Sequence, residues 1–273
     1  MIHQTAVIEE GAVIDPSAEI GPFCYISSRA KIGANCRLIA RVTILGDTTL
    51  GEGNVIFPNA CLGGGPQDHG NEFQPDARLI IGSHNVIREN VTMHAGTPKG
   101  QTSINGEEPE KLTTRVGSNG MFMINSHIAH DCVVGDNVIM TNNAVIGGHV
   151  RIGDGAILGG NSAVHQCVRI GRKAMIGGMT GVGRDVIPFG MVTGDRGNLR
   201  GLNQVGMKRG GYDEHTVKSV VRAYMYIFKG KEDTFENRVA KAKEKFADNE
   251  IVMEQLKFID EAMHSRRQLL VAD

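Results

Sequence analysis

The chain has few aromatic and few charged side chains for its length. Its 273 residues include no tryptophan and only four tyrosines, and 22% of all residues are charged. The formal net charge is −1, and no basic stretch is interleaved with aromatic residues. Nucleic-acid binding needs a concentration of positive charge, often beside stacking rings. The composition therefore predicts no nucleic-acid partner.

Long hydrophobic runs are missing as well. No window approaches the roughly 18 consecutive apolar residues that a membrane-spanning helix requires. The first residues, MIHQTAVIEEGAVIDPS, contain neither the basic nor the apolar segment of an export signal. We therefore expect a cytoplasmic protein with no membrane span.

Cysteine is scarce and irregularly placed. The five cysteines form no CxxC pair and no other spacing typical of a zinc site. Reduced thiols are the natural expectation in such a protein, and we expect neither a metal nor a cofactor.

Two features are abundant instead, namely glycine and a period of six residues. The 36 glycines are roughly twice what average usage would give. Counting in steps of six, a large apolar residue recurs without a failure in three runs. The runs are Ile2 to Leu62, Ile81 to Met93 and Val116 to Val182.

This period is typical of a hexapeptide β-helix, in which six residues form a short strand and a turn, and three such units close one triangular coil. The residue four places after each aliphatic is usually small, and Cys24, Cys36 and Cys132 occupy this position as core residues. About nine coils, stacked at the roughly 4.8 Å spacing of strands, would form a prism roughly 40 Å long. We predict an all-β solenoid plus α, a left-handed parallel β-helix of hexapeptide repeats with a C-terminal α-helical domain.

The repeat ends near Ile187. Residues 1–187 are expected to form the β-helix, with loop insertions at about 68–80 and 99–115. Residues 188–273 are expected to be a linker and a C-terminal helical domain, because Val217, Val220 and Tyr224 begin an apolar series at helical spacing. Two further amphipathic helices follow, and we expect them to cap the open end of the solenoid.

Counting hexads places several polar segments on one edge of the prism. They are GGGPQD (63–68), HAGTP (94–98), AHD (129–131), GGH (147–149) and HQC (165–167). Both insertions leave from this edge, and insertions that share a face of a solenoid commonly mark the binding face. A lone edge is convex, so a cleft needs a wall from a neighbour. We therefore predict a homotrimer with sites between subunits.

His130 is the best candidate for a general base on this edge. An imidazole titrates near neutral pH, and Asp131 could orient it or stabilise its charged form. The backbone N–H groups of the adjacent Gly-Gly pair could hold an oxyanion. This combination suits acyl transfer to a hydroxyl, and Cys167, although it lies on the edge, has no activating neighbour in the sequence.

Zinc binding is the competing interpretation of the same histidines. The gamma-type carbonic anhydrases use this solenoid and bind zinc with three histidines across subunits. They lack a large helical tail and a pair of long edge loops, so we favour a site without metal.

The motifs along this edge are specific enough to indicate a family. From the first hexad to the helical tail, the chain resembles the UDP-N-acetylglucosamine O-acyltransferases, which begin the synthesis of lipid A, the anchor of lipopolysaccharide. The matching stretches are IGPFC (20–24), PQD (66–68), IRENVTMHAGT (87–97), MINSHIAHDC (123–132), NNAVIGGHV (142–150), AVHQCVRIG (163–171) and GLNQVGMKRGGY (201–212).

The resemblance implies a role for each matching residue. His130, supported by Asp131, would take the proton from the 3-hydroxyl of the glucosamine of UDP-N-acetylglucosamine. That hydroxyl would attack the thioester of an (R)-3-hydroxyacyl chain carried on acyl carrier protein, while the N–H of Gly148 binds the oxyanion. Other residues would contact the substrates: Gln67, Asp68, His127 and His149 at the sugar or the acyl hydroxyl, and His165, Gln166, Asn203 and Arg209 along the nucleotide and pantetheine.

Two further implications concern the acyl donor. Gly178, with Met175 nearby, matches the position that measures acyl length in this family, and a glycine there favours a longer chain. Acyl carrier protein is acidic, so its docking site should be basic. The candidates near the tail are Arg169, Arg172, Lys173, Lys208, Arg209, Lys218 and Arg222.

The chain also departs from the family pattern. No lysine stands two residues after Gln67-Asp68, Val205 replaces a frequent glutamate, and Gly210 replaces a frequent second basic residue. These departures leave room for an alternative, a related sugar-nucleotide N- or O-acyltransferase with an acyl-CoA donor or a 3-amino sugar as acceptor.

Overall fold

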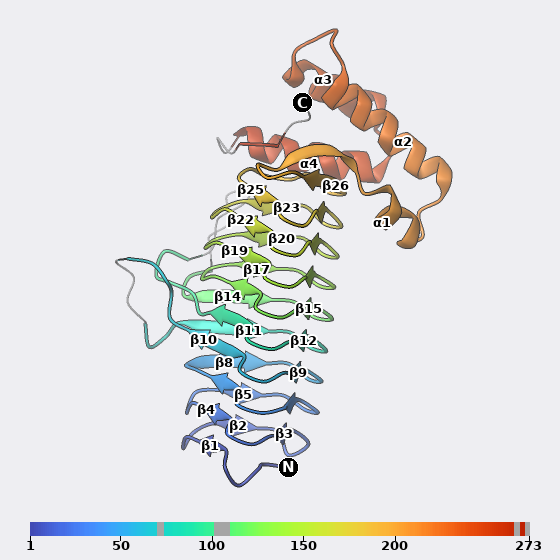
Figure 1. The fold of residues 1–273 in the computed structure, drawn as a ribbon. Helices are drawn as coiled ribbons and strands as arrows, with labels where there is room; N and C mark the ends of the chain where they lie inside the picture. Colours follow the sequence, from blue (N-terminus) through green and yellow to red (C-terminus); the bar gives the residue numbers. More distant parts are fainter. Residues whose placement is uncertain (70–73, 101–109, 265–267, 271–273) are drawn as a thin grey trace.

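The chain forms a three-sided column of short parallel strands that is crossed at its C-terminal end by helices (Figure 1). The computed structural model describes residues 1–69, 74–100, 110–264 and 268–270. The column is a left-handed parallel β-helix, as the six-residue period predicts.

Each side of the column is one sheet, and we name the three sides sheets A, B and C. Sheet A has the strand order β27 (Asn198–Leu202), β26 (Gly190–Thr193), β24 (Met175–Ile176), β21 (Ile157–Leu158), β18 (Ile139–Met140), β15 (Met121–Phe122), β12 (Val86–Ile87), β9 (Val55–Ile56), β6 (Arg37–Leu38) and β3 (Glu19–Ile20). Sheet B has the order β1 (Val7–Ile8), β4 (Tyr25–Ile26), β7 (Thr43–Ile44), β10 (Cys61–Gly64), β13 (Thr92–His94), β16 (His127–Ile128), β19 (Val145–Ile146), β22 (Ala163–Val164) and β25 (Gly181–Val182). Sheet C has the order β2 (Val13–Ile14), β5 (Lys31–Ile32), β8 (Asp47–Leu50), β11 (Arg78–Ile81), β14 (Thr113–Val116), β17 (Val133–Val134), β20 (Arg151–Ile152) and β23 (Arg169–Ile170).

The period of six sets which residues form the core. In a typical two-residue strand the second residue points into the shaft, and Ile26, Ile44 and Leu62 are completely buried there. Parallel pairing places each of these directly above the previous one. Cys24 and Cys36 pack in the same core, as their positions in the repeat predict.

Sharp turns between the strands require a backbone conformation with positive φ. Asn125, Asn143 and Asn161 supply it in successive coils, with φ of 60°, 59° and 55°. Asparagine adopts this conformation more readily than most residues. The side-chain amide of each also donates to the next one, at 3.0 Å and 3.1 Å, so the ladder links the coils along one edge.

Both insertions leave the column between sheet B and sheet C. Their ends differ from the expected bounds of 68–80 and 99–115, because β11 and β14 begin within those ranges. Each of these strands pairs over four residues, β11 with β8 and β14 with β11. The insertions thus lie between β10 and β11 and between β13 and β14.

The segment after residue 187 is not the linker that the sequence suggested. Strand β26 continues sheet A by pairing parallel to β24, and β27 folds back antiparallel to β26. The reason is that Val192 and Leu199 extend the apolar core, with 0% and 2% of their surfaces exposed.

Helices follow these strands. They are α1 (Gln204–Arg209), α2 (Glu214–Tyr224), the π-helical turn η1 (Met225–Lys229), α3 (Phe235–Lys245) and α4 (Glu250–His264). The apolar series that predicts α2 is confirmed, since Val217, Val220 and Tyr224 are buried. The short α1 was not expected. None of the helices described here is long and apolar enough to cross a membrane.

Helix α4 lies across the end of the column, and Arg169 of β23 joins the two parts. Its guanidinium donates to the carboxylates of Asp185 at 2.7 Å and Glu261 at 2.8 Å, and to the carbonyl of Phe258 at 3.1 Å. The Phe258 ring lies 4.1 Å from it. Only 3% of Arg169 is exposed, so its proposed part in docking an acidic partner is wrong.

The outward faces of the three sheets differ in chemistry. From β9 to β26 the outward residues of sheet A form a continuous column of apolar side chains, which we call the apolar face. It consists of Val55, Val86, Met121, Ile139, Ile157, Met175 and Met191. The outward residues of sheet B carry no acidic or basic group other than the imidazoles of His94 and His127, whereas sheet C carries Lys31, Arg115 and Arg151.

The buried ion pairs of Arg169 predict a large effect on stability. We expect Arg169→Met to lower the free energy of unfolding by about 3 to 5 kcal/mol, because two carboxylates lose their cation in a buried place. Arg37→Met is the matched control, since the Arg37–Glu19 pair is exposed and should contribute little. Urea denaturation followed by circular dichroism measures both, and equal losses would contradict the special role of Arg169.

Candidate active site

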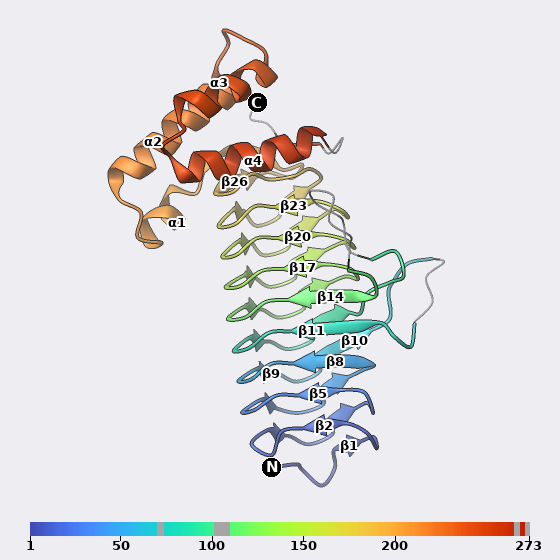
Figure 2. The ribbon, with the colours of Figure 1, turned by 180° about the vertical axis from the view of Figure 1, so that it is seen from behind.

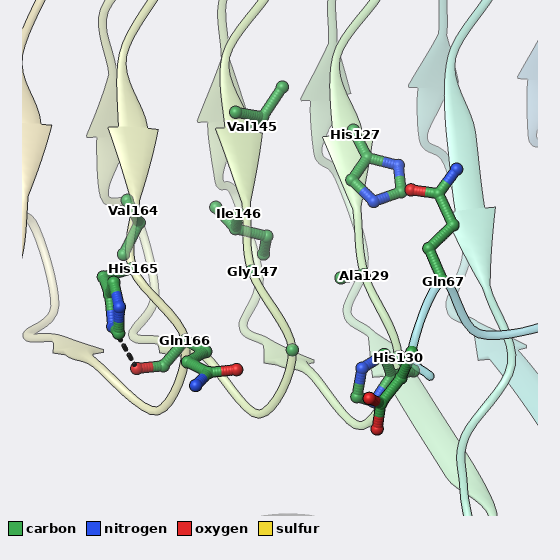
Figure 3. Close-up of a pocket in the computed structure, with 12 residues that line it drawn as sticks. Gln67, His127, Ala129, His130, Val145, Ile146, Gly147, Val164, His165 and Gln166 are labelled. Atoms are coloured by element: carbon green, nitrogen blue, oxygen red, sulfur yellow. Dashed lines mark hydrogen bonds between the residues drawn. The ribbon is translucent and has the colours of Figure 1, made fainter. Parts of the chain in front are cut away.

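A groove of about 440 Å³ runs along the edge between sheets B and C (Figure 3). Its walls come from the coils of β16, β19 and β22 and from the first insertion. The groove is lined by Gln67, Asp68, His127, Ala129, His130, Val145, Ile146, Gly147, Gly148, Val164, His165 and Gln166. The structure therefore brings together six of the residues expected to bind substrate or act on it, together with Gly148.

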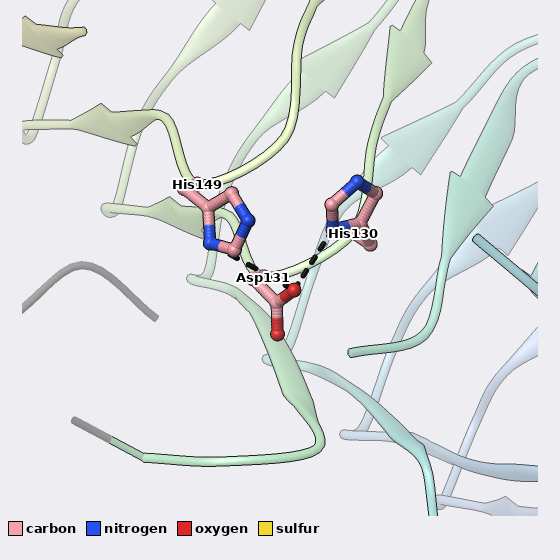
Figure 4. A group of neighbouring side chains, drawn as sticks. All are labelled: His130, Asp131 and His149. Carbon is pink, nitrogen blue, oxygen red and sulfur yellow. Dashed lines mark hydrogen bonds and ion pairs between the residues drawn. The ribbon is translucent and has the colours of Figure 1, made fainter. Parts of the chain in front are cut away.

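His130 and Asp131 form a hydrogen-bonded pair at this edge (Figure 4). Nδ1 of His130 lies 2.8 Å from Oδ2 of Asp131, which is completely buried. An ionised carboxylate can only accept, so Nδ1 carries the proton and the lone pair of a neutral ring is on Nε2. The arrangement can therefore take a proton at Nε2 while Asp131 stabilises the resulting cation.

Asp131 is itself held from several directions. Its Oδ1 accepts from the backbone N–H of Thr97 at 2.8 Å, and its Oδ2 accepts from the Thr97 hydroxyl at 2.6 Å. Its own N–H donates to the hydroxyl of Thr114 at 2.8 Å. These groups reach it from the segment after β13 and from β14. The repeat predicts that HAGTP shares an edge with AHD, but nothing in the sequence singles out Thr97.

His149 completes the cluster from the next coil. Its ring meets that of His130 edge to face, with 5.0 Å between the centroids. Its Nδ1 lies 2.9 Å from the carbonyl oxygen of Gly100, an acceptor, so this nitrogen must be the donor. In the neutral ring the lone pair is then on Nε2.

His130, Asp131 and His149 each offer an atom within 4.8 Å of the others, so a metal must be considered. A metal needs a nitrogen lone pair. Both Nδ1 atoms donate to oxygen acceptors, which leaves only the Nε2 lone pairs for a metal, and Oδ2 of Asp131 already accepts from Thr97 and His130. A metal held through Oδ2 would have to displace these donors, whereas a general base uses the hydrogen bonds as they are.

Two further imidazoles lie nearby, namely His127 of β16 in the same coil as His130, and His94 of β13 one coil below. His127 shares a hydrogen bond of 2.7 Å with the hydroxyl of Thr92, and its ring contacts that of His94 at 4.7 Å between centroids. Burial, and secondarily the positive charges of His127 and His130, lower the pKa of His94 to about 4. Burial and the charge of His130 also lower the pKa of His127. Both rings are therefore biased towards the neutral state beside the base.

Gly148 stands directly beside the proposed base. A Cβ on this residue would lie 2.6 Å from Cε1 and Nε2 of His130, closer than real atoms approach. Any side chain there would displace the imidazole of His130, and the backbone of Gly148 lies next to the atom that would take a proton. This position agrees with the expected role of its N–H in binding an oxyanion.

The first insertion contributes Gln67 and Asp68, and Figure 3 shows Gln67 beside His127. Asp68 forms an ion pair of 3.5 Å with Lys99, at the start of the second insertion. The two insertions thus meet at the groove through opposite charges. Lys99 was not among the expected site residues. Its place at the start of the second insertion was the one feature of the sequence that could have indicated it.

Four expected residues lie elsewhere in the same chain. Met175 belongs to the apolar face, and Gly178 is exposed in the turn that follows β24. Arg209 is exposed at the end of α1, which lies on the side of sheet A, opposite the insertions, in both Figures 1 and 2. Asn203 caps α1 by accepting from the N–H of Gly206 and donates to the carbonyl of Lys173. One chain therefore does not unite these residues with His130.

Comparisons with known proteins point to one family. A sequence profile described as "Udp N-acetylglucosamine O-acyltransferase; Domain 2" matches residues 185–270. The acyl-(acyl-carrier-protein):UDP-N-acetylglucosamine O-acyltransferase of Rhizobium johnstonii is 45% identical over 260 residues, which are 94% of this chain and 90% of that one. The enzyme of the same name from Caulobacter vibrioides is 45% identical and covers 94% of each chain.

Solved structures give the same result. The crystal structure of UDP-N-acetylglucosamine O-acyltransferase from Moraxella catarrhalis superposes with a TM-score of 0.89 at 35% identity, over 98% of this chain and 99% of that one. The enzyme from Campylobacter jejuni superposes with a TM-score of 0.87 at 34% identity, over the whole of both chains. With close relatives along nearly its full length and the same fold, the chain belongs to the UDP-N-acetylglucosamine O-acyltransferase family.

Proposed function

We propose that this protein transfers an (R)-3-hydroxyacyl chain from acyl carrier protein to the 3-hydroxyl of UDP-N-acetylglucosamine, the first step of lipid A biosynthesis. The observation that carries the proposal is the pairing of His130 with buried Asp131 at a groove, with Gly148 against the ring. The family of the chain supports the identity of both substrates.

The reaction follows from the tautomer of His130. Nε2 removes the proton of the sugar 3-hydroxyl as its oxygen attacks the thioester carbon. The C–O bond forms, and the carbonyl oxygen becomes an oxyanion that the N–H of Gly148 stabilises. When the intermediate collapses, the C–S bond breaks and the thiolate of the carrier leaves with the proton from His130. Asp131 stabilises the imidazolium between the two transfers, and no cofactor is required.

The remaining polar side chains of the groove have positioning roles in this proposal. Gln67, Asp68 and His127 surround one end of it and would hold the sugar. His149 has an accepting Nε2, which suits the 3-hydroxyl of the acyl chain. His165 and Gln166 lie at the other end, where nucleotide or pantetheine would pass.

Replacing the base tests the mechanism. We expect His130→Ala to lower kcat by about 10²- to 10⁴-fold, the usual contribution of a general base. His3→Ala, at the exposed N-terminal end of the solenoid, is the control and should keep full activity. Acyl transfer is measured by mass spectrometry of the product. Full activity of His130→Ala would contradict the role of His130 as the general base.

The same assay separates the alternative substrates. Acyl carrier protein and CoA thioesters are supplied as donors, with UDP-N-acetylglucosamine and its 3-amino analogue as acceptors. The proposal predicts the carrier-protein thioester and the 3-hydroxyl sugar. Preference for acyl-CoA or for the 3-amino sugar would favour the related acyltransferases instead.

We further propose that the protein is a homotrimer with its sites between subunits. The apolar face of sheet A would pack against the nearly uncharged sheet B face of the next subunit, and three such contacts close a ring. This arrangement brings Met175 and Arg209 of one subunit towards His130 of another, which a single chain does not do. Exposed Lys208 and Arg209 on α1 would then lie near the mouth of the groove, where acidic acyl carrier protein would dock.

A charge on the apolar face tests the assembly. We expect Ile157→Lys to dissociate the trimer, because the lysine would be buried against an uncharged surface. Light scattering should show a fall from three times 29.4 kDa to the monomer mass, with the circular dichroism spectrum retained. Thr49→Lys, on the outward side of sheet C, is the matched control and should stay trimeric.

Mixed trimers test the location of the sites. Subunits with His130→Ala are co-assembled with subunits carrying Arg209→Ala. In a ring whose sites take His130 from one subunit and Arg209 from the next, every mixed trimer contains one intact site. Activity should therefore rise above that of either variant alone, and no rise would contradict shared sites.

The proposed substrates also bear on localisation. Acyl carrier protein and sugar nucleotides are water-soluble carriers of the cell interior, so we propose that the enzyme acts in the cytoplasm.

A further inference from the structure

Thr97 lies at the base of the second insertion, where the chain leaves the column and returns to it. It is completely buried. Its carbonyl accepts from the N–H of Gly100 at 3.0 Å and from the N–H of Leu112 at 2.8 Å, so both ends of the insertion are tied to it. Gly100 in turn accepts from Nδ1 of His149. The base of the insertion is therefore connected to two histidines of the groove.

The side chain of Thr97 faces Asp131. Its hydroxyl donates to Oδ2 at 2.6 Å, the same oxygen that accepts from Nδ1 of His130, while its N–H donates to Oδ1 at 2.8 Å. The carboxylate thus has a Thr97 donor on each oxygen. Hydrogen bonds to a buried charged group are stronger than those between neutral groups.

Packing alone does not require this hydroxyl. A valine has nearly the same shape and would fill the same space without a polar atom. A buried hydroxyl is favourable only with a partner, and the partner here is the carboxylate that orients the base. The geometry thus favours a threonine at this position because its hydroxyl donates a hydrogen bond to Asp131.

We propose that Thr97 is a positioning residue for the general base, a role that rests on the proposed function. Its hydroxyl holds Oδ2 of Asp131 in the direction of His130 and shares the negative charge of that oxygen. His130 then presents Nε2 to the groove in one orientation. Through Gly100, the same stem also holds His149.

Removing the Thr97 hydroxyl should change the electrostatic interaction between Asp131 and His130 in one direction. Without the hydroxyl, Oδ2 keeps more of its charge for the imidazolium of His130, so the charged form of the ring is favoured relative to the wild type. The other groups near His130 keep their places, namely His149 from the turn after β19, His127 from β16, His94 from β13, and Asp68, which lines the same groove. The acidic limb of the kcat/KM profile, which reports the base in the free enzyme, then moves to higher pH.

The test compares Thr97→Val with Thr97→Ser. Valine removes the hydroxyl but keeps the backbone N–H, whereas serine restores the donor. We expect Thr97→Val to lose about tenfold to hundredfold in kcat, the factor that one hydrogen bond to a charged group supplies. KM should change little, and Thr97→Ser should recover most of the activity. Equal kcat in wild type and Thr97→Val would overturn the proposal.

A second measurement separates positioning from stability and from the chemistry. NMR titration of the His130 ring, with isotope-labelled histidine, should show the protonated ring persisting to higher pH in Thr97→Val than in the wild type, and wild-type behaviour in Thr97→Ser. In the Asp131→Asn background the valine substitution should lower kcat no further. An unchanged His130 titration, with only a lower Tm, would show that Thr97 is structural. This titration does not depend on acyl transfer, so it still decides the role of Thr97 if His130→Ala proves active.

Discussion

The whole molecule depends on the stacking of each coil on the one before it. A strand of two residues has almost no hydrogen bonds of its own, and its N–H and C=O groups are satisfied only by the coils above and below. Stacking therefore sets the position of each coil, and in an uninterrupted part it puts residues 18 apart directly above one another, as with His127 and Val145. Residues at the same position of successive coils therefore form a row, and His130, Gly148 and Gln166 line the groove in this way.

The insertions increase the number of residues between neighbouring coils without changing how the strands of those coils pair. Met93 pairs with Ile128, although the second insertion separates their coils. The residues that follow Met93 thus remain beside those that follow Ile128, which is how Thr97 reaches Asp131. An insertion at this edge can bring new groups to the base while the coils themselves stay in place.

The period of six was enough to predict the solenoid, its core and the edge that carries His130, because every coil obeys the same geometry. It was not enough for contacts that depend on side-chain direction. Arg169 occupies an ordinary outward position in the repeat, and only the arrival of α4 buries it between two carboxylates. Lys99 follows a turn whose path the repeat does not specify. In the same way, the side of the column that carries α1 depends on the fold-back of β27, which has no counterpart in the hexads.

The row of imidazoles bears on the proposal that one of them, His130, acts as the general base. Four protonated rings in adjacent coils would repel one another, and such repulsion is strong where water is excluded. Burial already disfavours the charged forms of His94 and His127, whose pKa values are lowered, and the charge that appears on His130 lowers them further. Asp131, the buried acid of this cluster, lies 2.8 Å from Nδ1 of His130 and 3.8 Å from Nδ1 of His149. In the proposed reaction the cation would form on His130, the ring nearest this carboxylate, and His94 and His127 would serve as neutral hydrogen-bonding groups for a substrate.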